Sequence, residues 1–201
     1  MARFVFPAPV VPGKQASQVA DTIRDRIPEY AKDLRLNLDA MSKVESLSPQ
    51  QLWGTALAVA LAARNDELVR AVSDEARAHL SEPAATAAKT AAALMGMNNV
   101  YYRALHLLSN AEYGTLPARL RMQGLASATA PDQGVERLDF ELWCLAVSAV
   151  NGCGQCLDSH ERELKKRGAT ALQIQDALRV ASILHAIAAV LDGERALAPL
   201  A

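Results

Sequence analysis

The hydrophobic positions along this chain recur at helical spacing, and no segment shows the strict alternation that is typical of a strand. The clearest helix start is Ser48-Pro49-Gln50-Gln51, which combines an N-cap serine, a proline at the first helical position and a glutamine at the capping-box position. The pattern therefore predicts an all-α fold. The predicted helices cover residues 29–41, 49–63, 66–80, 83–108 and 117–125, followed by a polar loop over 127–136 and further helices to the C-terminus.

The last third of the chain repeats the layout of the middle third. Leu52-Trp53 recurs about 90 residues later as Leu142-Trp143, and a similar apolar run follows each copy. In each copy a further helix and then a long alanine-rich helix follow. The long helix of the second copy begins with a capping box at Thr170. We therefore predict two pseudo-equivalent helical units on one core. The predicted boundaries are an extended arm over residues 1–16 and one all-helical domain over 17–201, with the repeat at about 48–108 and 138–197.

Composition narrows the class of protein. Hydrophobic residues make up 51% of the chain and aromatic residues only 4%, and the excess of alanine favours helices that pack closely through small side chains. A formal net charge of −1 gives no electrostatic footprint for nucleic acid. Ser182 and His185 interrupt the most apolar segment, and prolines break the N-terminal one, so neither a membrane span nor a secretory signal is predicted. We expect a cytoplasmic protein that binds no nucleic acid and no membrane.

The candidate chemistry lies in one segment. Cys153 and Cys156 form a Cys-x-x-Cys pair, His160 follows the second cysteine by four residues, and Glu141 precedes the first by twelve. The pair is expected at the N-terminal turn of a helix, where unpaired N–H groups and the helix dipole stabilise a thiolate. His160, one turn along the same face, can accept a thiol proton or stabilise the thiolate. In a reducing compartment such a pair is catalytic or metal-binding rather than structural.

Two alternatives remain open from the residues alone. Glu141 either folds over the thiols as a proton shuttle, or is an acidic first-turn residue in solvent behind an N-cap at Asp139. Zinc is the main rival for the thiols, because Cys153, Cys156 and His160 have acceptable ligand spacing. A structural zinc site also needs a fourth ligand, and the sequence offers no typical one.

The remaining cysteine and histidines are expected to be structural. Cys144 lies among apolar residues in the middle of a helix, which is typical of an inert core thiol. His185 is predicted to be a core histidine of the last helix, and His79 and His106 to be surface or helix-end residues. A thioredoxin-like fold is excluded, because no βαβ pattern surrounds the cysteine motif.

The cysteine motif belongs to a wider set of matching segments, which covers about residue 23 to the C-terminus. The other segments are Pro28-Glu-Tyr-Ala-Lys-Asp33 with Leu36-Asn-Leu38, Gln51-Leu-Trp-Gly-Thr55, Met95-Gly-Met-Asn-Asn-Val-Tyr101, Leu120-Arg-Met122 and Phe140-Glu-Leu-Trp143. Together these segments resemble the alkyl hydroperoxide reductase D (AhpD) proteins of the carboxymuconolactone decarboxylase-like superfamily.

The resemblance implies an all-helical fold, usually assembled as a homotrimer, and a thiol-dependent antioxidant role. In such proteins the dithiol reduces organic hydroperoxides and the oxidised peroxiredoxin AhpC, and dihydrolipoamide on a lipoyl-bearing 2-oxoacid dehydrogenase component restores it. It implies that Cys156 attacks peroxide and becomes a sulfenic acid, and that Cys153 is the resolving thiol and proton donor. Glu141 and His160 are the implied proton relay. The expected redox disulfide is Cys153–Cys156, with no bound cofactor and no metal.

One position departs from the family pattern. Well-known members have a histidine immediately before the second cysteine, where this chain has Gln155. Glutamine exchanges hydrogen bonds but does not titrate. If that histidine assists proton transfer, direct peroxidase turnover is expected to be weaker here, while disulfide exchange continues with His160. The alternative functions are a metal-binding helical module and a carboxymuconolactone decarboxylase-type enzyme.

Overall fold

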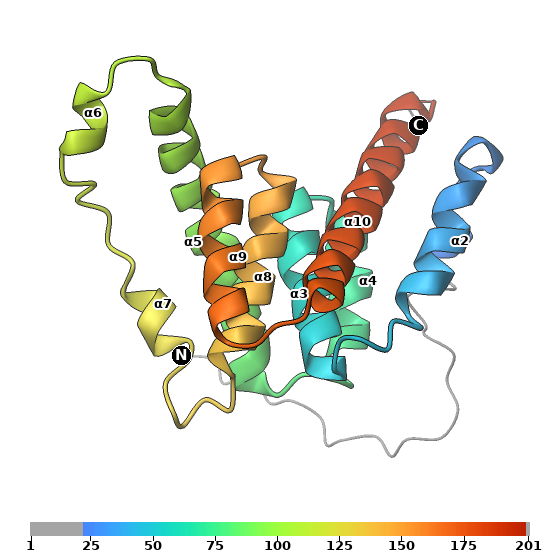
Figure 1. Cartoon of the computed structure of the whole chain (residues 1–201). Helices are drawn as coiled ribbons and strands as arrows, with labels where there is room; N and C mark the ends of the chain where they lie inside the picture. The colour runs from blue at the N-terminus through green and yellow to red at the C-terminus, as the bar shows by residue number, and fades with distance from the viewer. Residues whose placement is uncertain (1–21, 200–201) are drawn as a thin grey trace, which may run out of the picture.

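The computed structural model of the chain describes residues 22–199, and its regular elements are helices (Figure 1). In chain order the elements are η1 (Glu29–Ala31), α2 (Lys32–Met41), α3 (Pro49–Ala63), α4 (Asp66–Ala76), α5 (Glu82–Leu107), α6 (Glu112–Thr115), α7 (Gln123–Ser127), α8 (Arg137–Val150), α9 (Gly154–Lys166) and α10 (Ala171–Leu197). No strand occurs within residues 22–199, and the all-α prediction is confirmed. The predicted arm over 1–16 lies outside the described residues, and the repeat stays a prediction.

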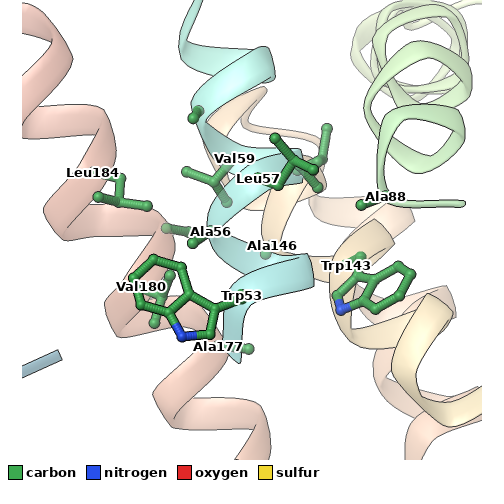
Figure 2. Packing of buried hydrophobic residues seen from close by; sticks show 14 of the residues in the cluster. Trp53, Ala56, Leu57, Val59, Ala88, Trp143, Ala146, Ala177, Val180 and Leu184 are labelled. Carbon is green, nitrogen blue, oxygen red and sulfur yellow. The ribbon is translucent and has the colours of Figure 1, made fainter. Parts of the chain in front are cut away.

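Helices α3, α5, α8 and α10 form the core, and α3 packs against the other three. Figure 2 shows side chains of α10 and α8 on either side of α3. The contact surface of α3 is rich in small residues, and Ala56, Ala58 and Ala60 have no exposed surface. At Gly54 the approach is closest, because a Cβ atom there would lie 2.2 Å from Cε2 of Trp143 on α8. The position of α8 against α3 therefore depends on a residue without a side chain.

The two predicted capping boxes are confirmed. Ser48 Oγ accepts a hydrogen bond from the Gln51 N–H at 3.2 Å, and Gln51 Oε1 accepts one from the Ser48 N–H at 3.0 Å. Thr170 and Gln173 make the same reciprocal pair at 3.1 and 2.9 Å. A cap of this kind contributes about 0.5–2 kcal/mol to stability. The two caps fix the starts of α3 and α10, both of which pack against α8.

α4 ends at Ala76, earlier than the predicted end near residue 80. The chain tightens into a turn there, in which the His79 N–H donates to the Ala76 carbonyl at 3.0 Å. The imidazole of His79 then lies flat on the indole of Trp53, with the ring centroids 5.1 Å apart and the planes at 5°. The expected helix-end position of His79 is confirmed, and the turn places its ring on α3.

The helix predicted over residues 117–125 is wrong, because residues 117–122 are not helical and short helices lie on either side. Leu116 has φ −83° and ψ 144°, the extended conformation that a following proline favours. Arg119 has a φ of 51°, which is outside the right-handed helical region. Pro117 therefore opens an extended segment rather than a helix.

α10 is long and apolar enough to cross a membrane by length and composition, but half of its most apolar window is buried inside this chain. Val180, Leu184 and Ile187 have no exposed surface, so we interpret α10 as a core helix. His185 lies on the opposite, exposed side, and the prediction of a core histidine is wrong. His106, near the end of α5, is exposed as predicted.

Candidate dithiol site

The Cys-x-x-Cys pair lies where α8 gives way to α9. Gly152 has a φ of +65°, a left-handed conformation that glycine adopts without steric cost. The chain turns at this glycine, and Cys153 is the N-cap of α9. The Cys153 N–H donates to the Ser148 carbonyl at 3.1 Å. The pair therefore sits at a helix N-terminus, as predicted.

Cys153 and Cys156 are joined by a disulfide, with their Cα atoms 5.3 Å apart. Cys153 Sγ also accepts a hydrogen bond from the Cys156 N–H at 3.3 Å, and such a contact stabilises negative charge on this sulfur once the bond opens. Cys153 has no exposed surface, whereas Cys156 is 7% exposed. A molecule that enters from solvent therefore meets Cys156 first.

Glu141 and His160 form a buried pair beside the disulfide. Glu141 projects from α8 and His160 from α9, and the imidazole Nδ1 lies 2.6 Å from the carboxylate Oε2. The Glu141 side chain is 4% exposed, because α9 packs along α8. The structure therefore brings the predicted relay residues together, and the alternative that placed Glu141 in solvent is wrong.

Asp139 is not the helix N-cap that the sequence suggested. α8 begins earlier, at Arg137, and Asp139 is buried in its first turn. Gln50 and Gln51 of α3 donate hydrogen bonds to the Asp139 carboxylate at 2.9 and 2.8 Å. These bonds tie the start of α8 to α3 and so help to set the position of Glu141.

Arg137 completes the polar group around Glu141. Its Nε and Nη2 atoms lie 2.7 and 2.6 Å from Glu141 Oε1, and its Nη1 donates to the Leu125 carbonyl at 3.0 Å. Each carboxylate oxygen of Glu141 thus has its own partner, arginine on one side and His160 on the other. Sequence reasoning missed Arg137, although its i, i+4 spacing to Glu141 on one helix was a usable signal.

Met95 of α5 contacts the second nitrogen of His160, with Nε2 and Sδ 3.2 Å apart. A carboxylate and a thioether both accept hydrogen bonds, so a ring that carries a proton on each nitrogen satisfies both contacts. Across residues 22–199, no hydrogen bond joins His160 to either disulfide sulfur. A direct role of His160 at the Cys156 thiol therefore requires Nε2 to exchange Met95 for sulfur after the disulfide opens.

A cleft of about 770 Å³ opens beside Cys156, with walls from α5, α8 and α9. This volume is in the range of small-molecule sites. Glu141 and His160 line the same cleft. The cations on its walls are Arg137, Arg162 and Lys166. The arrangement places Cys156, a buried carboxylate–imidazole pair and room for a small organic molecule together.

Comparison with known proteins identifies the family. The protein named alkyl hydroperoxide reductase AhpD from Rhodospirillum centenum is 53% identical over 177 residues, which cover 88% of this chain and 92% of that protein. The proteins of the same name from Streptomyces griseus and Frankia alni are 53% and 55% identical. These alignments cover 89% and 85% of this chain, and 98% and 89% of the two relatives. The model of the Carboxymuconolactone decarboxylase family matches residues 111–199. The chain belongs to the AhpD family.

Gln155 lies on the cleft wall of this AhpD-family chain and is exposed. It directly precedes Cys156 in the first turn of α9. Among the hydrogen bonds of residues 22–199, none involves the Gln155 side chain. Gln155, which stands where well-known family members have a histidine, is therefore free to contact a molecule that enters the cleft.

Cys144 stands apart from the dithiol. It is 1% exposed. Burial raises the pKa of its thiol well above the ordinary value, and the negative charge of Glu141 adds to this rise, while Arg137 opposes it. A neutral, inaccessible thiol does not react. The prediction of a core cysteine is confirmed.

The geometry gives no support to the zinc alternative. Within residues 22–199, no group of three or more His, Cys, Asp or Glu side chains is arranged to hold a metal ion. The sulfurs of Cys153 and Cys156 are bonded to each other, and the ring nitrogens of His160 are directed at Glu141 and Met95. A zinc site on these three ligands would require both an open disulfide and a reoriented imidazole.

Opposing influences set the pKa of Glu141. Burial raises this pKa, but the hydrogen bond and charge of His160, together with the charge and hydrogen bonds of Arg137, lower it by more. The net result is a pKa below the ordinary value of 4.5. Glu141 is therefore a carboxylate at neutral pH.

Replacing Glu141 by glutamine should cost stability in a pH-dependent way. Because the folded pKa lies below the unfolded one, the carboxylate contributes its full stability above about pH 4.5 and loses it as the pH falls through the folded pKa. We expect Glu141→Gln to be less stable than wild type by roughly 1–3 kcal/mol at pH 7. The deficit should shrink in urea unfolding below about pH 4.

The matched control for this experiment is Glu161→Gln, which removes an exposed carboxylate from α9. It should change stability by no more than about 0.5 kcal/mol. A Glu141→Gln deficit that stayed constant between pH 7 and pH 3.5 would contradict the assigned pKa direction.

Proposed function

We propose that this chain is a thiol-dependent antioxidant enzyme, in which Cys153 and Cys156 cycle between a dithiol and a disulfide. The dithiol reduces organic hydroperoxides and the disulfide of an AhpC-type peroxiredoxin. Dihydrolipoamide on a lipoyl-bearing 2-oxoacid dehydrogenase component supplies the electrons. The observation that carries the proposal is a disulfide at a helix N-terminus, with one sulfur on a cleft and the other buried behind it. Relatives named alkyl hydroperoxide reductase AhpD support the peroxide-reducing part.

In the open form His160 Nε2 leaves Met95 and takes the proton of the Cys156 thiol. The Cys156 thiolate then attacks the terminal oxygen of the hydroperoxide, because of the two cysteines only Cys156 lines the cleft. The S–O bond forms as the O–O bond breaks, which leaves a sulfenic acid on Cys156 and an alkoxide. The Cys153 thiol gives its proton to the alkoxide, which departs as the alcohol. Cys153 is then a thiolate at the N-cap of α9, where the Cys156 N–H stabilises it.

The second step closes the disulfide. The Cys153 thiolate attacks the sulfenic sulfur of Cys156, so that the S–S bond forms as the S–O bond breaks. The departing hydroxide takes a proton from His160 and leaves as water. The Cα atoms of the bonded pair lie 5.3 Å apart, within the ordinary range for a disulfide. Glu141, held by Arg137, stabilises the positive charge on His160 before this transfer.

Electrons return through thiol–disulfide exchange. One dihydrolipoamide thiolate attacks Cys156, because Cys153 has no exposed surface, and Cys153 leaves as a thiolate. The second lipoamide thiol displaces Cys156 from the mixed disulfide, and two protons accompany the two electrons to the cysteines. With oxidised AhpC the electrons leave this chain instead. The Cys156 thiolate attacks the AhpC disulfide, and Cys153 then resolves the mixed disulfide. Because Gln155 does not titrate, we propose that this exchange is faster than direct peroxide reduction.

We further propose that the chain acts in the cytoplasm as a homotrimer. The number of copies follows the family resemblance, and exposed apolar side chains on α5, α6 and the next segment support assembly. These side chains are Val100, Leu107, Leu108, Tyr113 and Leu116. Figure 1 shows that α6 lies beyond the end of α5, away from the core helices. Light scattering should give three times the mass of one chain, and a monomer at working concentrations would contradict the assembly.

A steady-state assay with dihydrolipoamide and an organic hydroperoxide tests the function. Wild-type protein should consume the two in equal amounts, whereas protein that is reduced and then alkylated should consume neither. The Cys144→Ala variant is the control, because its buried thiol takes no part and turnover should remain. Peroxide reduction that survived alkylation would contradict the proposal.

The same preparations separate the other two classes of function. A decarboxylase of the superfamily would keep its turnover of a lactone substrate after alkylation. A metal-binding module would carry about one zinc ion per chain as purified and release it to a chelator. Either result, together with an absence of peroxide turnover, would contradict the proposed function and support that other class.

A further inference from the structure

Asn98 lines the dithiol cleft without a hydrogen-bond partner. It lies on α5 about one turn after Met95 and one turn before Tyr102, and all three line the cleft beside Cys156. Asn98 is only 5% exposed. Its Oδ1 atom is buried and unpaired, and it is the one buried side-chain nitrogen or oxygen in this condition across residues 22–199.

The adjacent asparagine shows what a structural role looks like here. Asn99 Nδ2 donates to Ser148 Oγ at 2.9 Å, and Asn99 Oδ1 accepts from Asn151 Nδ2 at 3.0 Å. These bonds join α5 to α8. Among the described residues, Asn98 makes no such bond through either its oxygen or its nitrogen. One asparagine thus holds two helices together, while its neighbour lines the cleft and makes no side-chain hydrogen bond within residues 22–199.

A buried amide without a partner lowers stability, and an apolar side chain of similar size would avoid the loss. Real proteins keep such a group mainly at functional sites, where a water, an ion or a ligand can supply the missing bonds. Asn98 shares its cleft with Cys156. The partner that the amide lacks is therefore expected among the molecules that react with this sulfur.

We propose that Asn98 is a substrate-binding residue that hydrogen-bonds the carboxamide of the dithiol that reduces Cys153–Cys156, an assignment that rests on the proposed function. The asparagine amide presents one donor and one acceptor side by side, and a carboxamide offers the complementary pair. One ligand group then supplies the partner that the buried Oδ1 lacks and accepts a hydrogen bond from Nδ2.

The arrangement of the cleft distinguishes such a dithiol from a simple hydroperoxide. Asn98 belongs to α5 and Cys156 to α9, so the two contribute to different walls. In dihydrolipoamide an aliphatic chain separates the carboxamide from the thiols, which allows both ends to be engaged at once. Leu125 and Tyr102 line the same cleft, are only half-buried and offer apolar surface to this aliphatic chain. The reacting oxygen of a hydroperoxide, by contrast, must lie at the sulfur itself.

The Asn98→Leu variant tests the assignment. Reduction of the disulfide is followed with dihydrolipoamide and with dithiothreitol, which carries no carboxamide. The ratio of the two kcat/KM values, dihydrolipoamide over dithiothreitol, should fall about tenfold in the variant, mainly through a higher KM for dihydrolipoamide. Asn98→Ala is the second variant, with the same expected fall.

Thermal unfolding distinguishes substrate binding from a structural role, because loss of a structural residue lowers the Tm. The Tm of Asn98→Leu should equal or exceed that of wild type, because an unpaired buried amide is lost. Asn99→Leu, the matched control, should lower the Tm, because it breaks two satisfied bonds. A lower Tm in Asn98→Leu would overturn the proposal, since it would mean that a water molecule satisfies this amide structurally.

Two kinetic outcomes would also overturn the proposal. One is an unchanged ratio in both variants. The other is an equal loss in the rate at which a hydroperoxide oxidises the reduced protein, which would place Asn98 on the peroxide instead. A wild-type disulfide that dihydrolipoamide does not reduce would overturn the proposed function itself, and it is distinguishable because wild type then fails before any variant is compared.

Discussion

Cys156→Ser should lose dihydrolipoamide-dependent peroxide reduction entirely, a fall of at least about a thousandfold in kcat/KM. Of the two bonded cysteines, only Cys156 has exposed surface and lines the cleft. A serine hydroxyl is not ionised at neutral pH, so it neither attacks a peroxide nor exchanges with a disulfide. Peroxide consumption measured with dihydrolipoamide as the only reductant gives the result.

The matched variant, Cys153→Ser, separates the roles of the two thiols. The attack at Cys156 remains possible, but nothing resolves its product. Mass spectrometry should therefore find a sulfenic acid, or a mixed disulfide with an added thiol, on Cys156 alone. Full activity in Cys156→Ser would exclude the assigned attacking thiol, and a stable adduct on Cys153 in that variant would reverse the two roles.

Gly54→Ala should destabilise the fold by about 2–3 kcal/mol, although alanine favours a helix by about 1 kcal/mol over glycine. A Cβ atom at this position would lie 2.2 and 2.3 Å from Cε2 and Cζ2 of Trp143. Trp143 has no exposed surface, and Phe140 packs against its indole with centroids 6.4 Å apart. The indole has little room to move away, so the helices α3 and α8 must separate. Urea unfolding measures the loss.

A double-mutant cycle makes this prediction specific. Trp143→Ala alone should cost about 3–5 kcal/mol, because it empties a buried site. In that background the clash is gone, and Gly54→Ala should now stabilise the protein by about 0.5–1 kcal/mol through helix propensity. The sign of the Gly54→Ala effect therefore reverses. Leu172→Ala, at a 53% exposed position on α10, is the control, with a change within about 0.5 kcal/mol. Equal effects of Gly54→Ala in both backgrounds would contradict the packing.

The helix starts and the place of the dithiol could be predicted because their information is local. The Ser48 and Thr170 caps depend on residues three positions away. Cys153 and Cys156 lie within the first turn of one helix, so their proximity follows from helical spacing alone. The pairing of Glu141 with His160 spans two helices. The residues alone left it open, and only the resemblance to a known family predicted it.

The other neighbours of the site could not be predicted, because they come from elements distant in sequence. Met95 is 65 residues from His160, and nothing in the pattern of α5 marks it as a contact of the imidazole. Asn98 and Asn99 are equivalent in sequence terms. Only the packing of α5 against α8 distinguishes the bonded residue from the unpaired one.

Two predicted helix starts were wrong, at Asp139 and at Pro117. Asp139 fits an N-cap by its position, but the amides of Gln50 and Gln51 bind its carboxylate inside the first turn of α8. At Asp139 the local preference is therefore smaller than the free energy of these contacts. Pro117 also fits a helix start, but Leu116 before it is extended and Arg119 has a positive φ.

The reversible opening of Cys153–Cys156 is tested most directly by following both thiols through one turnover. Protein treated with one equivalent of dihydrolipoamide should become alkylatable at both cysteines, as read by peptide mass spectrometry. One equivalent of an organic hydroperoxide should then return both to a form that alkylation does not modify, and a second addition of dihydrolipoamide should restore them. Cysteines that stay unmodified after the first reduction, or that stay alkylatable after the peroxide, would contradict the account.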